Sequence, residues 1–251
     1  MASITDVQRY SKAVGRSIDL AKRDIIRVYL AVTADGAGAE EVRRAMQAAA
    51  QAIVRKYGNV ASAAALEYYR GLVDGGGDGF EPDMGDPAEY SPYVAESVRW
   101  AMGGETPEDT AARLSQLTDF YVKRHATDTM VSNALRDPMD TYFARVPTGS
   151  TTCDFCITLA SRGFVYATAK SAGAFNSFHE GCDCQIVASR EPGVSGYDSK
   201  LYLEVYANKI ARDTPDRMSP EARAFYEQNK EERKARRREL YAQKRERQKA
   251  D

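Results

Sequence analysis

Residues 3–32, SITDVQRYSKAVGRSIDLAKRDIIRVYLAV, decide the fold. Their apolar side chains recur at alternating steps of three and four, which places them on one stripe of a single amphipathic helix. Ser3 followed by Asp6 resembles a capping box, in which a hydroxyl caps the helix and an acid follows three residues later. We therefore expect this helix to bury one face against partners. The stripe consists of Val7, Val14, Ile18, Ala21, Ile25, Val28 and Val32.

Further helices with short connections are predicted after it. A second helix is expected over 40–57, with Gly58-Asn59 interrupting it before a third short helix that ends near Val73. Ser91-Pro92 and Thr106-Pro107 each combine a cap with a proline in the first turn, and each predicts a helix start. The last helix is long and ends at Asp137-Pro138, so the pattern favours a helix bundle. Its predicted inward residues are Leu114, Leu117, Tyr121, Ala126, Met130 and Leu135.

The character of the sequence changes after residue 139. Short strands are predicted at 142–146, 163–166 and 184–187 because β-branched and aromatic residues gather there between turn residues. The expected fold class is α+β and predominantly helical. We predict a helical domain at 1–139, a small Cys/His module of short strands at 140–192, and a polar linker with a basic C-terminal helix at 193–251.

The four cysteines all fall between positions 153 and 184. Two residues separate Cys153 from Cys156, which is the spacing of half a tetrahedral zinc site. His179 and Cys182 repeat that spacing, and Cys184 is a fifth candidate. Four of these five are predicted to hold a structural Zn²⁺, because three short strands bury too little apolar surface to be stable unaided. Disulfide bonds and simple packing of reduced thiols remain alternatives.

The module resembles a known family. Residues 142–163, YFARVPTGSTTCDFCITLASRG, and residues 178–184, FHEGCDC, resemble the minor head proteins related to protein F of phage Mu, in the variant found in tailed phages of actinobacteria. The resemblance covers about positions 140–190. It implies a minor capsid protein inside the head near the portal, made in the host cytoplasm, with portal, capsid or scaffold proteins as partners. It also implies a role in head assembly, genome packaging or DNA delivery.

Charge is balanced overall, with 35 Lys and Arg against 36 Asp and Glu, but it is unevenly distributed. Positions 230–249 carry ten basic and four acidic residues, a net charge of +6. This segment is interpreted either as a solvated helix or as an arm that contacts phage DNA or an acidic protein surface. The candidate contact residues are Arg233, Lys234, Arg236, Arg237, Arg238, Lys244, Arg245 and Arg247.

Enzyme motifs are absent from the sequence. Neither a Gly-x-Ser-x-Gly elbow nor a His-Glu-x-x-His pair occurs, and the two histidines are His125, expected at or near the surface, and His179. No apolar run approaches the ~18–20 residues needed to cross a bilayer, so we expect a soluble protein without a membrane partner. The sequence predicts a non-enzymatic protein. The alternative, which the resemblance to the minor head proteins implies, is a capsid maturation protease acting during head assembly.

Overall fold

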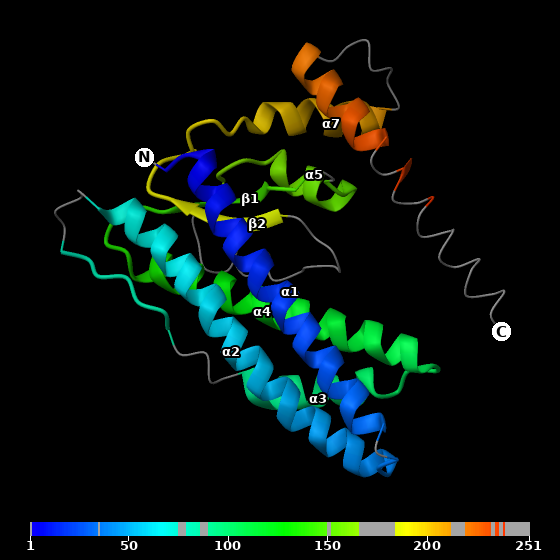
Figure 1. Cartoon of the computed structure of the whole chain (residues 1–251). Helices are drawn as coiled ribbons and strands as arrows, with labels where there is room; N and C mark the ends of the chain where they lie inside the picture. The colour runs from blue at the N-terminus through cyan, green and yellow to red at the C-terminus, as the bar shows by residue number, and fades with distance from the viewer. Residues whose placement is uncertain are drawn as a thin grey trace.

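A computed structural model describes residues 2–34, 36–74, 79–85, 90–149, 152–165, 184–211, 219–231, 234–235 and 238. Within these residues the chain is predominantly helical with one two-stranded sheet, which confirms the fold class in its coarse form (Figure 1). The elements are α1 (Ile4–Ala34), α2 (Ala39–Val73), α3 (Ser91–Ala101), α4 (Pro107–Arg136), β1 (Tyr142–Pro147), α5 (Asp154–Ala160), β2 (Cys184–Ser189) and α7 (Ser199–Ala211), followed by a helix at 220–231.

The helix starts are set by the predicted caps. Ser3 and Asp6 form the capping box, since the Ser3 amide donates to the Asp6 carboxylate at 3.0 Å and the Asp6 amide donates to the Ser3 hydroxyl at 3.3 Å. Thr106 caps α4 by accepting a hydrogen bond from the Asp109 amide at 3.1 Å. Both caps were readable from the sequence because they involve neighbours three residues apart.

The three long helices α1, α2 and α4 pack side by side, and α3 covers one end of α2 and α4 (Figure 1). α4 contacts both α1 and α2, and half of its residues are buried, including the polar residues Thr118 and Asp119. The Asp119 carboxylate accepts a hydrogen bond from the ammonium group of Lys22 on α1 at 3.1 Å. Leu135, predicted to point inward, is exposed, whereas the neighbouring Asn133 and Ala134 are buried, so Leu135 lies on the outer face of α4.

The predicted interruption at Gly58 is wrong, because α2 runs unbroken from Ala39 to Val73. Gly58 faces His125 on α4, and a Cβ atom at position 58 would lie 2.3 Å from the ring carbon Cδ2 of that histidine. The glycine therefore permits close packing of two helices rather than ending one of them. The same contact corrects the expectation for His125, which is buried with only 2% of its surface exposed.

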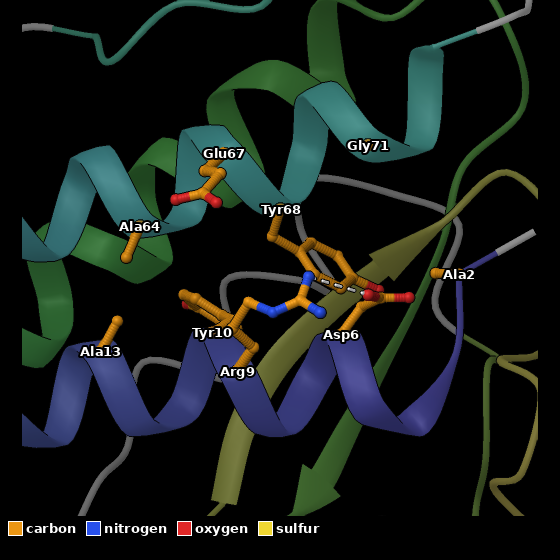
Figure 2. Close-up of a pocket in the computed structure, with 9 residues that line it drawn as sticks. All are labelled: Ala2, Asp6, Arg9, Tyr10, Ala13, Ala64, Glu67, Tyr68 and Gly71. Atoms are coloured by element: carbon orange, nitrogen blue, oxygen red, sulfur yellow. Dashed lines mark hydrogen bonds and ion pairs between the residues drawn. The ribbon is translucent and has the colours of Figure 1, made fainter.

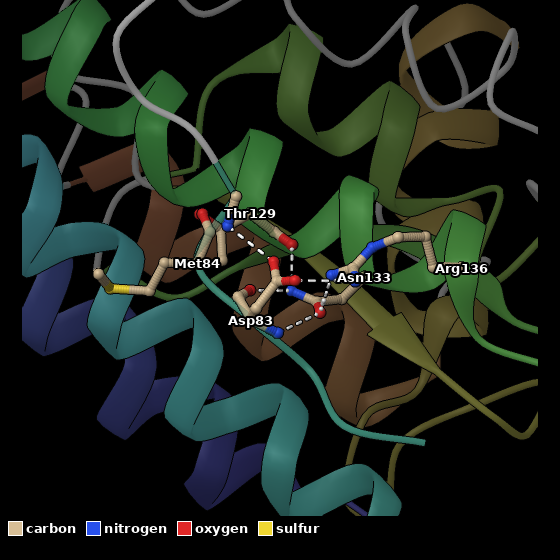
Figure 3. A network of polar contacts seen from close by, with 6 residues as sticks. Asp83, Met84, Thr129, Asn133 and Arg136 are labelled. Atoms are coloured by element: carbon tan, nitrogen blue, oxygen red, sulfur yellow. Dashed lines mark hydrogen bonds and ion pairs between the residues drawn. The ribbon is translucent and has the colours of Figure 1, made fainter. Parts of the chain in front are cut away.

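A short segment, residues 79–85, crosses α4 and is held there by side chain to backbone hydrogen bonds (Figure 3). The Asn133 amide group pairs with both backbone groups of Asp83, at 2.9 and 2.6 Å. Thr129 donates to the Met84 carbonyl at 2.8 Å, and Arg136 forms an ion pair with the Asp83 carboxylate at 2.8 Å. Asn133 is completely buried, so the segment between α2 and α3 is fixed to the bundle by a satisfied polar contact.

The sheet consists of β1 and β2 paired antiparallel, with Tyr142 opposite Ser189 and Pro147 opposite Cys184. Every residue of β2 is buried, because one core cluster continues from α1, α2 and α4 into both strands. The strand predicted at 163–166 is wrong for its described part, residues 163–165, which contain no strand. Gly163 has a φ of +63° and turns the chain away directly after α5.

Asp137 joins the bundle to the sheet. Its side chain is fully buried and accepts two hydrogen bonds of 2.9 Å from the guanidinium of Arg190, the residue after β2. The same carboxylate accepts a hydrogen bond of 2.7 Å from the hydroxyl of Tyr69 on α2. Burial and this contact raise the pKa of Tyr69 far above its usual range, so it stays a neutral donor. α2, α4 and the end of β2 are thus fixed at one point.

A second helical layer covers α5. Ile157 of α5 packs against Val205 of α7 and Ala222 of the helix at 220–231. The Asn229 side chain accepts a hydrogen bond from the Thr152 amide at 2.8 Å. α7 lies in a part of the chain that was predicted to be a polar linker, and the helix at 220–231 falls within the C-terminal region 193–251 for which a helix was predicted. None of the described helices is both long and apolar enough to cross a membrane.

We predict that Gly58→Ala destabilises the protein by about 2 kcal/mol, because the new methyl group overlaps the buried His125 ring. Gly15→Ala is the matched control. It lies in the interior of α1 with nothing within 4 Å of its new Cβ, so it should be neutral or stabilise by up to about 1 kcal/mol. Urea unfolding of both variants measures the difference, and equal effects would contradict the close packing at Gly58.

His125 should make stability depend on pH. Burial lowers its pKa from 6.5 to about 4, and its ring stands edge-on to Tyr90 at a centroid distance of 4.9 Å. The unfolded chain therefore binds the proton more tightly, so stability is full above pH 6.5 and falls as the pH drops from 6.5 to 4. We expect this histidine to account for a loss of about 3 kcal/mol across that window.

Urea unfolding of the wild type and of His125→Gln at several pH values between 7 and 4 isolates this contribution, because all other titrating groups are common to both proteins. The wild type should lose more stability than the variant. Parallel pH profiles would show that the imidazole is as easily protonated in the fold as in the unfolded chain.

Candidate functional site

The candidate site is the cysteine cluster at the junction of α5 and β2. Cys153 is the N-cap of α5, with an extended backbone, and its Sγ accepts a hydrogen bond from the Cys156 amide at 3.3 Å. Cys156 lies one turn into the helix and is fully buried. Cys184 is the first residue of β2 and is also fully buried. The Cys-x-x-Cys sequence thus forms the start of a helix.

Three of the five predicted ligands come together. The Sγ atoms of Cys156 and Cys184, which are 28 positions apart in the chain, lie 3.1 Å from each other, and Cys153 packs against this pair. A disulfide bond would bring the two sulfur atoms to about 2.05 Å, so both residues are thiols in this structure. The other two predicted ligands, His179 and Cys182, lie outside the described residues.

Arg145 was not predicted as part of the site. It is completely buried on β1, and its Nη1 lies 3.6 Å from the Cys184 Sγ. Its guanidinium also stands over the Phe155 ring, 5.6 Å from the centroid. A guanidinium in this position offsets negative charge on nearby sulfur atoms. The sequence did hold one signal, an arginine in the middle of an otherwise apolar strand. Burying an arginine is unfavourable unless a charged or polar group pairs with it, so a partner could have been expected.

The described residues contain no group of three or more His, Cys, Asp or Glu side chains arranged to hold a metal ion. The zinc site predicted from the spacing is therefore not found in this part of the chain. Zinc bound at 2.3 Å by tetrahedral thiolates holds its sulfur atoms about 3.8 Å apart. Cys156 and Cys184, at 3.1 Å, would have to separate slightly to share an ion. The arrangement as it stands suits either a cross-link or a metal bound after a small adjustment.

The basic C-terminal segment starts next to this cluster. The helix at 220–231 packs on α5 through Ala222 and Ile157, so it leads from the cysteine module into the basic residues. Lys234 and Arg238 are described and exposed, and the Lys234 ammonium pairs with the Glu231 carboxylate at 2.6 Å. The other predicted contact residues lie outside the described part: Arg233, Arg236, Arg237, Lys244, Arg245 and Arg247.

A separate cavity of about 190 Å³ lies between the start of α1 and the end of α2, beside the sheet (Figure 2). The Arg9 guanidinium contacts the Asp6 carboxylate at 3.2 Å across its rim, and the buried rings of Tyr10 and Tyr68 form its wall. Tyr68 donates a hydrogen bond to the Ala188 carbonyl on β2 at 3.1 Å. The titratable side chains that line it are those of Asp6, Arg9, Tyr10, Glu67 and Tyr68.

A protein-family model described as VG15 protein matches residues 1–209. The chain belongs to the VG15 protein family. The match covers most of the chain, including the helix bundle, both strands and all four cysteines, and it stops before the basic segment at 230–249. No match is found among curated proteins or among solved structures.

Membership of the VG15 family supports a phage origin for the chain, in agreement with the coarse part of the resemblance carried by the cysteine module. The finer resemblance, to the minor head proteins related to protein F of phage Mu, stays a prediction. Because the family match includes the bundle, the helical part and the cysteine module are features of the same family.

Proposed function

We propose that this protein is a non-catalytic minor capsid protein that acts in head morphogenesis, near the portal, in capsid assembly, genome packaging or DNA delivery. Membership of the VG15 family supports a role in the phage particle. The module at 140–190, with its Cys-x-x-Cys, glycine turn and His-x-x-Cys-x-Cys, supports the comparison with minor head proteins. The observation that carries the proposal is the meeting of Cys153, Cys156 and Cys184, since it makes the motif one structural unit.

The absence of catalysis is part of the proposal. His125, one of two histidines in the sequence, is buried against Gly58 and the Tyr90 ring, where it cannot reach a substrate. Burial also keeps its pKa near 4, far below that of a base matched to neutral pH. The cysteines contact one another and the Arg145 side chain within the fold, as expected for a structural cluster.

The proposed cofactor is one structural Zn²⁺. Cys153, Cys156 and Cys184 would supply three thiolates, and Cys182 or His179 would supply the fourth ligand. Three sulfur donors fit zinc, which prefers thiolate and imidazole in closed structural sites. Arg145 would offset part of the negative charge of the thiolates. When bound, the ion would tie α5 to β2, while the protein's own packing places the bundle against the sheet.

We predict that freshly purified protein under reducing conditions contains about one equivalent of zinc, measured by plasma emission spectrometry. Cys156→Ser should lose the metal, because it removes a buried ligand from the centre of the cluster. Thr158→Ala, in the same helix, is the control and should retain it. His179→Ala and Cys182→Ser identify the fourth ligand by which of them releases zinc. Less than half an equivalent in the wild type would refute the zinc site.

The basic segment is proposed to contact phage DNA or an acidic surface of the portal, capsid or scaffold proteins. Its positive charge extends from a helix anchored on the cysteine module through Ile157 and Ala222. Phosphate neutralisation by several Lys and Arg residues gives affinity that falls with salt. The module would then position the segment, and the segment would make the contact.

We predict that the protein copurifies with DNA-filled heads as a minor component, detected by mass spectrometry of particles separated by density.

Replacing Arg236, Arg237 and Arg238 with Gln should lower the fraction of DNA-filled heads if the segment contacts DNA. The same three positions changed to Lys keep the charge and should leave the fraction unchanged. A protein found only outside the heads would overturn the proposed function.

A further inference from the structure

We propose that Cys156 and Cys184 form a reversible disulfide bond, made when the protein passes from a reducing to an oxidising environment. The chemistry follows from the geometry of the described thiols and does not require zinc. Its biological setting, a particle assembled in the cytoplasm and released from it, rests on the proposed function. The disulfide would become the covalent cross-link between α5 and β2.

The two thiols are already in position for a bond. Their Sγ atoms lie 3.1 Å apart, so a closure of about 1 Å is enough to reach disulfide length. Both residues are held by structure on separate elements. Cys156 follows the cap of α5, which is packed beneath α7, and Cys184 is fixed in register opposite Pro147. Bringing two residues so far apart in the chain together normally lowers the conformational entropy of the chain. Folding has already brought these two thiols together, so the disulfide requires no further loss of this kind.

Cys153 provides the entry for an oxidant. Cys156 and Cys184 are fully buried, whereas Cys153 is half-buried and packs directly against them. A small disulfide such as oxidised glutathione can therefore reach Cys153 first. Thiol exchange proceeds from accessible sulfur atoms, so the half-buried Cys153 determines the rate.

Oxidised glutathione converts the Cys156 and Cys184 thiols into a disulfide by three successive thiol–disulfide exchange steps. The Cys153 thiolate attacks oxidised glutathione, forms a mixed disulfide and releases one reduced glutathione. The Cys156 thiolate attacks the Cys153 sulfur, forms a Cys153–Cys156 disulfide and releases the second glutathione. The Cys184 thiolate then attacks the Cys156 sulfur and frees Cys153. In sum, two thiols lose two electrons and two protons, and one glutathione disulfide becomes two glutathione thiols.

The cross-link has two consequences. It closes a loop between positions 28 residues apart, which restricts the unfolded chain and should raise the melting temperature by roughly 10 °C. It also uses two sulfur atoms that are proposed zinc ligands, so a chain cannot hold both the disulfide and the four-ligand zinc site. Oxidation would exchange one cross-link for another at the same place, between α5 and β2.

The test uses the full chain, stripped of metal with a chelator and incubated with oxidised glutathione. Digestion with trypsin and with a protease that cleaves before aspartate separates all four cysteines, because Asp154 and Asp183 each lie between two of them. Mass spectrometry should find the Cys156 peptide linked to the Cys184 peptide, and reduction should abolish the linkage. A dominant linkage through Cys182, or glutathione adducts alone, would refute the proposal.

Variants separate the roles of the thiols. Cys184→Ser should abolish the linkage and the rise in melting temperature, whereas Cys182→Ser should leave both intact. Cys153→Ser should still form the bond but about tenfold more slowly, since the entry thiol is missing. An unchanged rate would refute the entry role of Cys153. Zinc content is measured separately on the untreated protein, so failure of the zinc site and failure of the disulfide give different results.

Discussion

The carboxylate of Asp137 is the point on which the arrangement of the molecule depends. It receives hydrogen bonds from Arg190 after β2 and from Tyr69 on α2, while it stands at the end of α4. A buried charge is tolerated only when it is paired, and removing one partner from such a pair costs about 3–5 kcal/mol. The sheet is therefore fixed at its Ser189 end, and the Cys184 end of β2 is placed by the register.

The cysteine cluster lies at the other end of the sheet, between the bundle and the C-terminal helices. On one side β2 belongs to the same core as α1, α2 and α4. On the other side α5 packs against α7 and the helix at 220–231, and Asn229 bonds to the backbone just before Cys153. A zinc ion or a disulfide bond between Cys156 and Cys184 would thus connect the bundle to the helix at 220–231, from which the basic segment continues. This placement gives a structural cluster a direct connection to the most charged part of the chain.

Sequence signals that involve neighbouring residues were confirmed at the helix caps and at the first strand but not at residues 163–165, and features that depend on distant partners were misjudged. The capping box at Ser3, the start of α4 at Thr106 and the strand at 142–146 depend on neighbours within a few residues, and the structure confirms them. Gly58 and His125 were misjudged for one shared reason. From the sequence alone, a glycine predicts a helix break and a histidine beside charged residues predicts an exposed side chain. In the structure α2 and α4 pack closely at this point, which keeps α2 continuous and buries His125.

The sequence by itself determined a predominantly helical protein with a cysteine module, because periodicity, caps and motif spacing are properties of short stretches, and the resemblance of that module to a known family suggested a phage origin. The tertiary structure alone decided that α2 is continuous, that Arg145 is buried beside Cys184, and that two thiols 28 positions apart lie in contact. These facts depend on the antiparallel register of two strands and on the packing of α5. Neither is encoded locally, because each requires contacts between segments far apart in the chain.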